Sequence, residues 1–316
     1  MLDVVALGEL LIDFTCQRVD ASGYPTMAAH PGGAPANFLA ALSKFGAKTA
    51  FLGKVGNDAF GKRLRDTLRG SGIDTTGLLL ADDVFTTLAF VTLDETGDRE
   101  FSFSRKPGAD TCLHFEELEL SLIDDARVFH FGSLSLTDEP AATATRKAVA
   151  YAKSKGKLIT YDPNLRKMLW SDLEFARQQL IWGISQADVV KLSDEEVAFL
   201  WDLEPEAGAR YMLEHFGVRL VFVTCGADGC FFSNGSASGW VPALSGIRVV
   251  DTTGAGDIFG GSALWKLLQL GKNPEDLNEA QLREITRFAC VSAGLSTTAE
   301  GGISSVPDLE QVLQYL

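Results

Sequence analysis

A chain of 316 residues with 28 basic and 42 acidic side chains has a net charge of −14, which excludes the basic surface that nucleic acid or an anionic membrane would need. Its 46 % apolar and 22 % charged residues are ordinary for a globular protein long enough to bury a large core. We therefore expect small-molecule partners, with no nucleic acid and no membrane. An anionic ligand would have to be attracted by a local site, because the overall field repels it.

Two features predict a cytoplasmic location. The first residues lack a basic region followed by a long apolar run, and no segment reaches the roughly 18 apolar residues of a membrane span. The cysteines are odd in number and show no repeated pair spacing, which predicts buried, reduced thiols. These cysteines are Cys16, Cys112, Cys225, Cys230 and Cys290.

The first third of the chain is predicted to mix strands and helices. Phe60, Leu64 and Leu68 recur at helical spacing, whereas residues 99–104 alternate between apolar and polar side chains as in a half-buried strand. In chain order, we expect a strand at Val4–Leu7, an irregular stretch at 17–30, a helix after 31–37, a strand at Ala50–Leu52, a helix at Asp58–Arg69, and a hairpin of Thr86–Leu93 and Arg99–Ser104 around 94–98.

From residue 128 onward, strands alternate regularly with helices. The expected strands are Val128–Phe131, Lys157–Tyr161, Val189–Leu192, Leu220–Thr224, Cys230–Phe232 and the strand-like Ile247–Val250. The expected helices are Glu139–Lys155, Leu173–Ile184, Asp194–Trp201, Ala207–His215, Gly256–Leu270 and Asn278–Ser296.

Apolar strands that alternate with amphipathic helices predict a mostly parallel sheet covered on both faces, which is a three-layer α/β/α fold. The early β insertions, at about 14–30 and 85–104, predict a small sheet over one edge. Without an internal repeat or a disordered linker, residues 1–316 are expected to form a single domain.

The strongest chemical signal is the stretch Asp251-Thr-Thr-Gly-Ala-Gly-Asp257, placed before a helix. Its small residues leave the backbone N–H groups of 254–257 uncovered at a helix N-terminus, where they form a site for a phosphate or a developing negative charge. Asp257 would lie in the first turn, where an ionised carboxylate can accept a proton from an attacking hydroxyl. The alternative is that Asp257 is only a helix cap and the glycines form a plain turn.

Other phosphate-binding patterns are absent. The sequence contains no Gly-x4-Gly-Lys-Ser/Thr, and the first strand ends in Gly8-Glu-Leu-Leu11 where a dinucleotide fold would carry Gly-x-Gly-x-x-Gly. Thr224, Gly226 and Gly229 follow an apolar strand, which suits either a nucleotide contact at the carboxyl edge of the sheet or a hairpin turn.

Three further stretches have both a ligand-binding and a structural interpretation. Gly32 and Gly33 precede a helix that contains Asn37, which suits either close approach of a ligand or an ordinary helix start. Asp13 ends the first apolar region, as a carboxylate for sugar hydroxyls or as a solvated group. Arg166 follows the strand at 157–161 and is either a local cation for a phosphate or part of a surface turn.

Taken together, these motifs resemble the PfkB (ribokinase-like) carbohydrate kinases over essentially the full chain. Residues 32–37 followed by 53–61 are similar to the first signature of that family, and residues 251–257 are similar to the second. Residues 7–13, 162–166 and 191–196 look most like fructokinases. The resemblance implies that a small β-sheet lid is formed by the insertions at about 14–30 and 85–104.

The resemblance also implies ATP-Mg²⁺ phosphorylation of a sugar hydroxyl. Asp257 would be the base, and Gly254, Ala255 and Gly256 would build the anion hole with it. The implied sugar contacts are Asp13, Gly32, Gly33, Asn37, Arg105, Arg166 and Asp257. The implied nucleotide contacts are Lys191, Ser193, Glu196, Thr224, Gly226, Gly229, Gly254 and Gly256. Asp251 and the carbonyl of Thr253 match a site for a monovalent cation, usually K⁺.

One position departs from the family pattern. Many members carry Asn-x-x-Glu near the metal and phosphates, whereas this chain has Ser193-Asp-Glu-Glu196. Ser193 is a shorter donor than Asn, but Glu196 keeps its place, so we expect it to organise Mg²⁺ through water.

The leading hypothesis is a fructokinase that transfers the ATP γ-phosphate to the 6-hydroxyl of fructose. A 2-keto-3-deoxygluconate kinase and an aminoimidazole riboside kinase are alternatives within the family. The alternative from another class is a non-catalytic sugar- or nucleotide-binding protein on the same fold. A homodimer through the exposed face of the lid is compatible with the resemblance.

Overall fold

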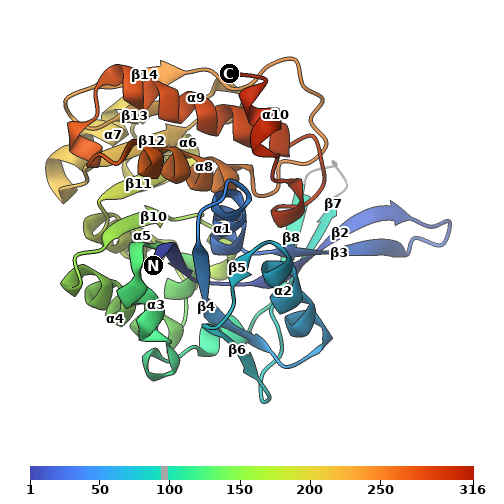
Figure 1. The fold of residues 1–316 in the computed structure, drawn as a ribbon. Helices are drawn as coiled ribbons and strands as arrows, with labels where there is room; N and C mark the ends of the chain where they lie inside the picture. The colour runs from blue at the N-terminus through green and yellow to red at the C-terminus, as the bar shows by residue number, and fades with distance from the viewer. Residues whose placement is uncertain (94–98) are drawn as a thin grey trace.

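The computed structural model describes residues 1–93 and 99–316, and a ten-stranded sheet forms its centre (Figure 1). The strand order is β14-β13-β12-β11-β10-β9-β1-β4-β5, with β6 paired to β4. The pairs from β12 to β5 are parallel, whereas β13 and β14 join as an antiparallel edge. The strands are β1 (Leu2–Leu7), β4 (Thr49–Gly56), β5 (Ile73–Asp74), β6 (Leu78–Ala81), β9 (Ala126–Gly132), β10 (Leu158–Asp162), β11 (Val189–Ser193), β12 (Leu220–Thr224), β13 (Cys230–Ser233) and β14 (Ser238–Val241).

Helices cover both faces of this sheet. Val4 and Val5 are adjacent on β1 and point to opposite faces, so they belong to two separate buried clusters. The first cluster packs the sheet against α1, α2, α8, α9 and α10, and the second packs it against α3, α4, α5, α6 and α7. The helices are α1 (Ala34–Lys44), α2 (Ala59–Gly70), α3 (Leu120–Asp125), α4 (Ala141–Ser154), α5 (Leu173–Gln186), α6 (Asp194–Trp201), α7 (Pro205–Phe216), α8 (Ala255–Leu270), α9 (Glu279–Ser296) and α10 (Leu309–Leu313).

The predicted three-layer α/β/α fold with a mostly parallel sheet is therefore confirmed. Most predicted elements are present within a few residues of their expected ends, because buried β-branched runs and i, i+4 apolar spacing dominate them. Local caps set several boundaries: Asp58 accepts the N–H of Gly61 at the start of α2, and Asn278 accepts that of Gln281 at the start of α9. Among the helices of 1–93 and 99–316, none combines the length and apolar character needed to cross a bilayer.

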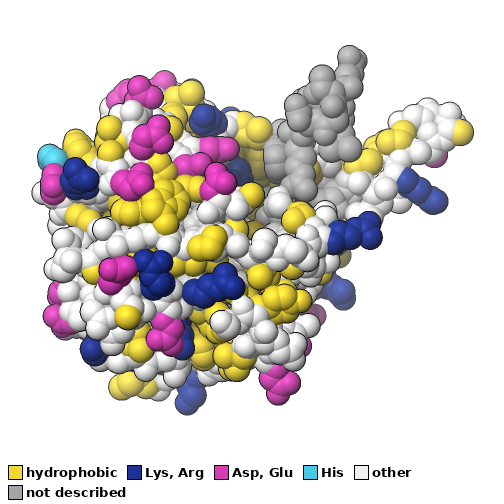
Figure 2. Space-filling model, turned by 90° about the horizontal axis from the view of Figure 1, so that it is seen from above, with side chains coloured by type: hydrophobic (Ala, Val, Ile, Leu, Met, Phe, Trp, Pro, Cys, Tyr) yellow, Lys and Arg dark blue, Asp and Glu magenta, His cyan; other side chains and the backbone are white. Residues whose placement is uncertain are grey.

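A second sheet of four strands, which we call the small sheet, projects from the body. Its order is β3-β2-β7-β8, with strands β2 (Leu11–Val19), β3 (Pro25–Gly32), β7 (Leu88–Leu93) and β8 (Arg99–Ser104). Figure 2 shows the β2–β3 arm from above, extending beyond the body, and Val19 and Tyr24 near its tip are 61 % and 72 % exposed. That this sheet closes as a lid stays a prediction.

Two local predictions are wrong. Residues 17–30 are largely strand, because they add to the small sheet through antiparallel pairing of β2 with β3. Residues 247–250 form no strand, although Ile and Val favour one. The N–H of Val250 donates to the carbonyl of Thr297 in the α9–α10 segment, and its side chain is half exposed, so no sheet edge receives it. The expected turn at 94–98 lies outside the described residues.

Candidate active site

A cavity of about 580 Å³ lies between the carboxyl ends of the parallel strands and the small sheet. Ligands of open α/β sheets bind at this edge, because the loops that follow the strands converge there. The wall combines the strand-end residue Glu9, the first turns of α1 and α8, and residues of β2, β7 and β8. Its polar members are Glu9, Asp13, Thr15, Gln17, His30, Asn37, Asn164, Arg166, Asp251, Thr252, Thr253, Asp257 and Glu300.

Asp257 lies in the first turn of α8 and is 8 % exposed. The N-cap of this helix is Gly254, whose φ of 75° suits glycine, and no side chain caps the helix. The alternative that Asp257 is an N-cap is therefore wrong. Its carboxylate instead accepts hydrogen bonds from Nδ2 of Asn37 at 2.9 Å and from Nδ2 of Asn164 at 3.4 Å.

Burial raises the pKa of Asp257, while the hydrogen bond from Asn37 and the charges of Lys191 and Arg166 act in the opposite direction. A carboxylate with these neighbours is held in a fixed orientation and is a stronger base than a solvated one. It meets the geometric and electrostatic needs of a general base that faces a cavity.

The turn before α8 supplies backbone donors. Within the described residues, the N–H groups of Gly254, Gly256 and Asp257 have no hydrogen-bond partner, whereas that of Ala255 donates to the carbonyl of Thr252 at 3.2 Å. In this structure the uncovered donors thus come from three of the four expected residues, and Ala255 closes the turn. A side chain at Gly256 would place its Cβ 2.9 Å from Nζ of Lys191, so the turn lies directly against that ammonium.

Lys191 forms a buried ion pair with Asp162, with Nζ 3.0 Å from Oδ2. Burial by itself lowers the pKa of Lys191, but the carboxylates of Asp162, Glu196 and Asp257 together raise it. Burial raises the pKa of Asp162, against the attraction of Lys191. The pair places a cation beneath the anion-binding turn without adding net charge to the interior.

A smaller pocket of about 180 Å³ adjoins this pair, and its wall includes Arg166, Lys191, Ser193 and Glu196. Ser193 and Glu196 form a capping box at the start of α6: Ser193 Oγ accepts the N–H of Glu196, and Glu196 Oε2 accepts that of Ser193. Oε1 of Glu196 accepts the N–H of Leu165 at 2.7 Å, which ties the loop after β10 to α6. The box explains why serine is compatible with this position.

The sugar-side candidates gather around Asp13. Burial raises the pKa of this carboxyl to about 6, although Arg166 lowers it. Gly32 is required because a Cβ there would lie 2.0 Å from Oδ2 of Asp13. Gly33 has a φ of 122°, and its Cβ would lie 2.4 Å from the carbonyl oxygen of Glu9. Both glycines let the chain pass close to the carboxylate side of the cavity.

Arg105 does not line the cavity. It is 4 % exposed, and its guanidinium forms an ion pair with Asp110 at 2.8 Å while also donating to Oγ1 of Thr137 and the carbonyl of Leu134. The expected sugar contact is thus not present in this structure, because the buried carboxylate of Asp110, six residues beyond the end of β8, binds the guanidinium.

Thr224, Gly226 and Gly229 form the turn between β12 and β13. The N–H of Cys225 donates to the carbonyl of Gly229, and a Cβ at Gly229 would lie 2.1 Å from the carbonyl oxygen of Val241. The hairpin-turn alternative therefore describes the geometry, and these residues line neither cavity. Thr224 pairs with Ser193 across the parallel strands, so a nucleotide contact at this edge stays a prediction.

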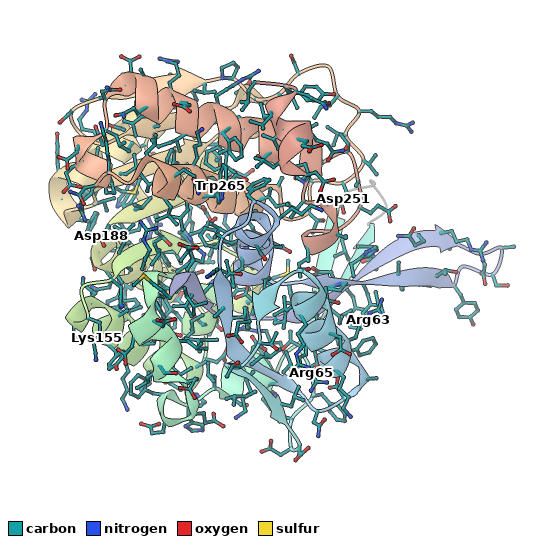
Figure 3. The ribbon with its side chains drawn as sticks, in the orientation of Figure 1. Arg63, Arg65, Lys155, Asp188, Asp251 and Trp265 are labelled. Atoms are coloured by element: carbon teal, nitrogen blue, oxygen red, sulfur yellow. The ribbon has the colours of Figure 1, made fainter. Side chains whose placement is uncertain are left out.

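Asp251 connects two segments at the cavity rim (Figure 3). Oδ1 accepts the N–H and hydroxyl of Thr253 at 2.9 and 2.7 Å, and Oδ2 accepts the N–H of Gly301 at 2.9 Å. The carboxylate thus shapes the turn that precedes Gly254. Its expected role as a cation ligand, with the Thr253 carbonyl, stays a prediction.

The comparisons with known proteins agree with this geometry. The model of the "pfkB family carbohydrate kinase" matches residues 1–309. The chain belongs to this family. It is 42 % identical over 316 residues to the probable fructokinase-3 of Arabidopsis thaliana, covering 99 % of this chain and 91 % of that protein, and 42 % identical over 317 residues to fructokinase-1 of Zea mays, covering 99 % and 97 %.

Solved structures of pfkB relatives superpose over the whole chain. Fructokinase with bound ATP from Xylella fastidiosa has a TM-score of 0.92 at 32 % identity and covers 100 % of this chain and 98 % of its own. Fructokinase from Vibrio cholerae, in a form with fructose, ADP and calcium ion, has a TM-score of 0.87 at 30 % identity and covers 100 % and 99 %. This protein is therefore a phosphotransferase of the carbohydrate kinase class with a ribokinase-like fold.

The site of this pfkB kinase also contains residues that the sequence interpretation missed. Glu9 follows a buried strand, and both Glu9 and Asn164 lie inside stretches already singled out, residues 7–13 and 162–166, without being named as site residues there. His30 and Glu300 face each other across the cavity wall, with Nε2 and Oε2 4.0 Å apart. No local pattern connects those two residues, because they come from opposite ends of the chain.

Proposed function

We propose that this protein is an ATP-dependent fructokinase that transfers the γ-phosphate of ATP to the 6-hydroxyl of D-fructose. The observation that carries the proposal is the buried carboxylate of Asp257, oriented by Asn37 and Asn164 beside uncovered backbone donors, in a cavity shared with Asp13 and Arg166. The names of the similar curated proteins and solved structures point to the same sugar.

Asp257 would act as the general base. Its carboxylate accepts the proton of the sugar hydroxyl as that oxygen attacks the γ-phosphorus. Burial raises its pKa towards the working pH, which strengthens it as a base, and the Asn37 amide keeps one oxygen engaged. The proton thus moves from the attacking hydroxyl to a carboxylate oxygen, the sugar oxygen bonds to the γ-phosphorus, and the bond from that phosphorus to the bridging oxygen of ATP breaks to release ADP.

The backbone N–H groups of Gly254, Gly256 and Asp257 would bind the negative charge on the transferred phosphoryl oxygens. Their position at the start of α8 adds the favourable end of the helix dipole. Lys191 and Arg166 would supply the local positive charge that an acidic protein needs to bind ATP. Thr224, Gly226 and Gly229 would contact the nucleotide from the β12–β13 turn.

The donor set around the smaller pocket fits Mg²⁺ that arrives with ATP. Among the described residues, no group of three or more His, Cys, Asp and Glu could hold a metal. Mg²⁺ typically uses phosphates, water and one or two carboxylates, and Glu196 would serve through water. The bound ion would neutralise charge on the phosphates. Asp251 and the Thr253 carbonyl would hold K⁺ beside the anion-binding turn.

Asp13 and Asn37 would bind the sugar hydroxyls, with Arg166 nearby. The small sheet would close over the sugar and exclude water, which protects ATP from hydrolysis. A cytoplasmic location and a homodimer through this sheet complete the proposal; sedimentation analysis tests the dimer.

The position of Arg105 weakens the case for a 2-keto-3-deoxygluconate kinase. A substrate carboxylate needs a cation, and the guanidinium of Arg105 is bound to Asp110 away from the cavity, which leaves Arg166 to fill that role. A coupled assay of ADP release with fructose, ribose, 2-keto-3-deoxygluconate and aminoimidazole riboside tests the substrate. We expect fructose to give the highest kcat/KM, and a higher value for another sugar would overturn the assignment. Binding without ADP release would indicate a non-catalytic protein.

A further inference from the structure

Helix α1 starts without a cap from its own sequence. Its N-cap is Gly33, no side chain of the segment bonds to the first turn, and Pro35 has no N–H. The N–H groups of Ala36 and Asn37 both donate to the carbonyl of Gly33. The N–H of Ala34 is left over, and a buried helix terminus with an unmet donor is costly.

Glu9 supplies the missing acceptor from another part of the chain. It follows β1, is 3 % exposed, and its Oε1 accepts the N–H of Ala34 at 2.9 Å. The backbones of Glu9 and Gly33 also lie in close contact, because a Cβ at Gly33 would be only 2.4 Å from the carbonyl oxygen of Glu9. The end of β1 and the start of α1 are thus joined by one side-chain bond and one close backbone contact.

A purely electrostatic role for Glu9 is less consistent with its neighbours. Arg105 and Asp110 are the charged groups that act on it from the segment after β8, and their effects on its pKa oppose each other. Burial raises that pKa to about 7, so the carboxyl is costly to keep ionised. The guanidinium of Arg105 is bound to Asp110. A protonated or an ionised carboxyl can still accept the Ala34 N–H.

The first turn of α1 also carries Asn37 towards the reaction centre. Asn37 is 4 % exposed, and its Nδ2 donates to Oδ2 of Asp257 at 2.9 Å. The N-cap of α8 also lies close to this amide, since a Cβ at Gly254 would be 3.0 Å from Nδ2 of Asn37. A small rotation at the start of α1 would therefore change the bond between Asn37 and Asp257.

We propose that Glu9 is a positioning residue: by accepting the Ala34 N–H it fixes the start of α1 and so holds Asn37 against Asp257. The chain of contacts runs from the end of β1, through α1, to the first turn of α8. The inference rests on the proposed role of Asp257 as base. It adds that Glu9, at the opposite side of the cavity, keeps this base in position through α1 and Asn37.

A double-mutant cycle on sugar phosphorylation tests the proposal. Glu9→Ala removes the acceptor and should lower kcat/KM for the sugar roughly 10- to 100-fold, because a misplacement of about 1 Å can cost about 10²-fold. Glu9→Gln keeps an acceptor oxygen and should restore most of the activity. In an Asn37→Ala background, Glu9→Ala should change kcat/KM by no more than about twofold, since residues that act through one contact are not additive.

The pH profile gives a second readout that a stability defect would not move. The Asn37 hydrogen bond lowers the pKa of Asp257, so loosening it should shift the acid limb of kcat to higher pH in Glu9→Ala and leave it in place in Glu9→Gln. Asn278→Ala is the matched control, because Asn278 caps α9 by accepting the Gln281 N–H at 3.0 Å and lines neither pocket of the site. It should lower the melting temperature and leave the profile unchanged.

Two results would overturn the inference. The first is that the effects of Glu9→Ala and Asn37→Ala on kcat/KM multiply in the double variant. The second is that the loss of activity in Glu9→Ala is fully explained by its lower melting temperature. Thermal unfolding of every variant, followed by assays well below each melting temperature, separates the two cases. Failure of the proposed function looks different: the wild-type protein would then phosphorylate no sugar, or Asp257→Asn would keep full activity.

Discussion

The carboxyl and amino ends of the parallel strands form two edges of the large sheet, and the two edges differ in the charged groups that they carry. At the carboxyl edge, β1, β10 and β11 lead into Glu9, Asp162 and the Ser193–Glu196 box, and α1, α6 and α8 begin there. At the amino edge, a second cavity of about 520 Å³ has five cations in its lining, and α4 and α8 end beside it. Asp251 and Asp188, labelled in Figure 3, lie towards these two ends of the molecule. The cations are Arg127, Lys153, Lys157, Arg219 and Lys272.

The direction of the helices explains this difference. In a βαβ arrangement the helices run opposite to the strands, so their positive ends meet at the carboxyl edge and their negative ends at the amino edge. Lys153 donates to the carbonyl of Gln186 at the end of α5, and Lys157 donates to that of Asp124 at the end of α3. Arg219 pairs with Asp188 and Glu275.

The comparison shows that a cluster of charges indicates a ligand site only where its groups are not already engaged by the fold. Arg127, Lys153, Lys157 and Arg219 engage helix ends or carboxylates, and Lys272 donates to Oε1 of Gln281. The carboxyl edge instead leaves the N–H groups of Gly254, Gly256 and Asp257 without partners among the described residues. The predictions below test whether function is confined to that edge.

The largest effect is expected for Asp257→Asn. The substitution keeps the shape and the contact with Asn37 but removes the base, so kcat should fall by roughly 10²–10⁴ while KM for sugar and ATP stays within a few-fold. Steady-state kinetics with both substrates, together with sugar binding by calorimetry, measure this split. An unchanged kcat would remove Asp257 from the mechanism.

A smaller effect is expected for Arg166→Gln. The guanidinium lowers the pKa of both Asp13 and Asp257, and the wild-type cavity should lose activity as the pH falls through about 6, where Asp13 protonates. Without Arg166 both pKa values rise, so the acid limb of kcat/KM should move to higher pH. At neutral pH, kcat/KM should fall roughly 10- to 100-fold, as for a lost hydrogen bond to a charged group of about 1.5–3 kcal/mol.

Arg219→Gln is the charge-matched control for that variant and gives the smallest expected effect. Its pair with Glu275 is partly exposed, so the free energy of unfolding should fall by about 0.2–1 kcal/mol, less at high salt. Urea unfolding at two ionic strengths measures this change. Activity and its pH profile should match the wild-type protein. A shift of the acid limb like that of Arg166→Gln would show that the amino edge influences the site.

Much of the candidate site could be predicted because its residues lie in short, continuous stretches. The turn at 251–257 and the glycines before α1 each indicate a close backbone approach, and the structure brings both to one cavity with Asp13. Asp13 was expected at the end of the first strand, whereas it lies inside β2 of the small sheet. The sugar contact of Arg105 was implied only by the family resemblance. It failed because a competing partner, Asp110, depends on how the chain folds back after β8.

The sequence by itself determined the layered α/β architecture and the position of the anion-binding turn. Both depend on local physics. The spacing of apolar residues in each segment determines the architecture, and only small residues leave the backbone N–H groups of the turn uncovered. Only the tertiary structure decided which contacts hold that turn in place. The bonds from Glu9 to Ala34 and from Asn37 to Asp257 join segments that are far apart in the chain, so no spacing or periodicity records them.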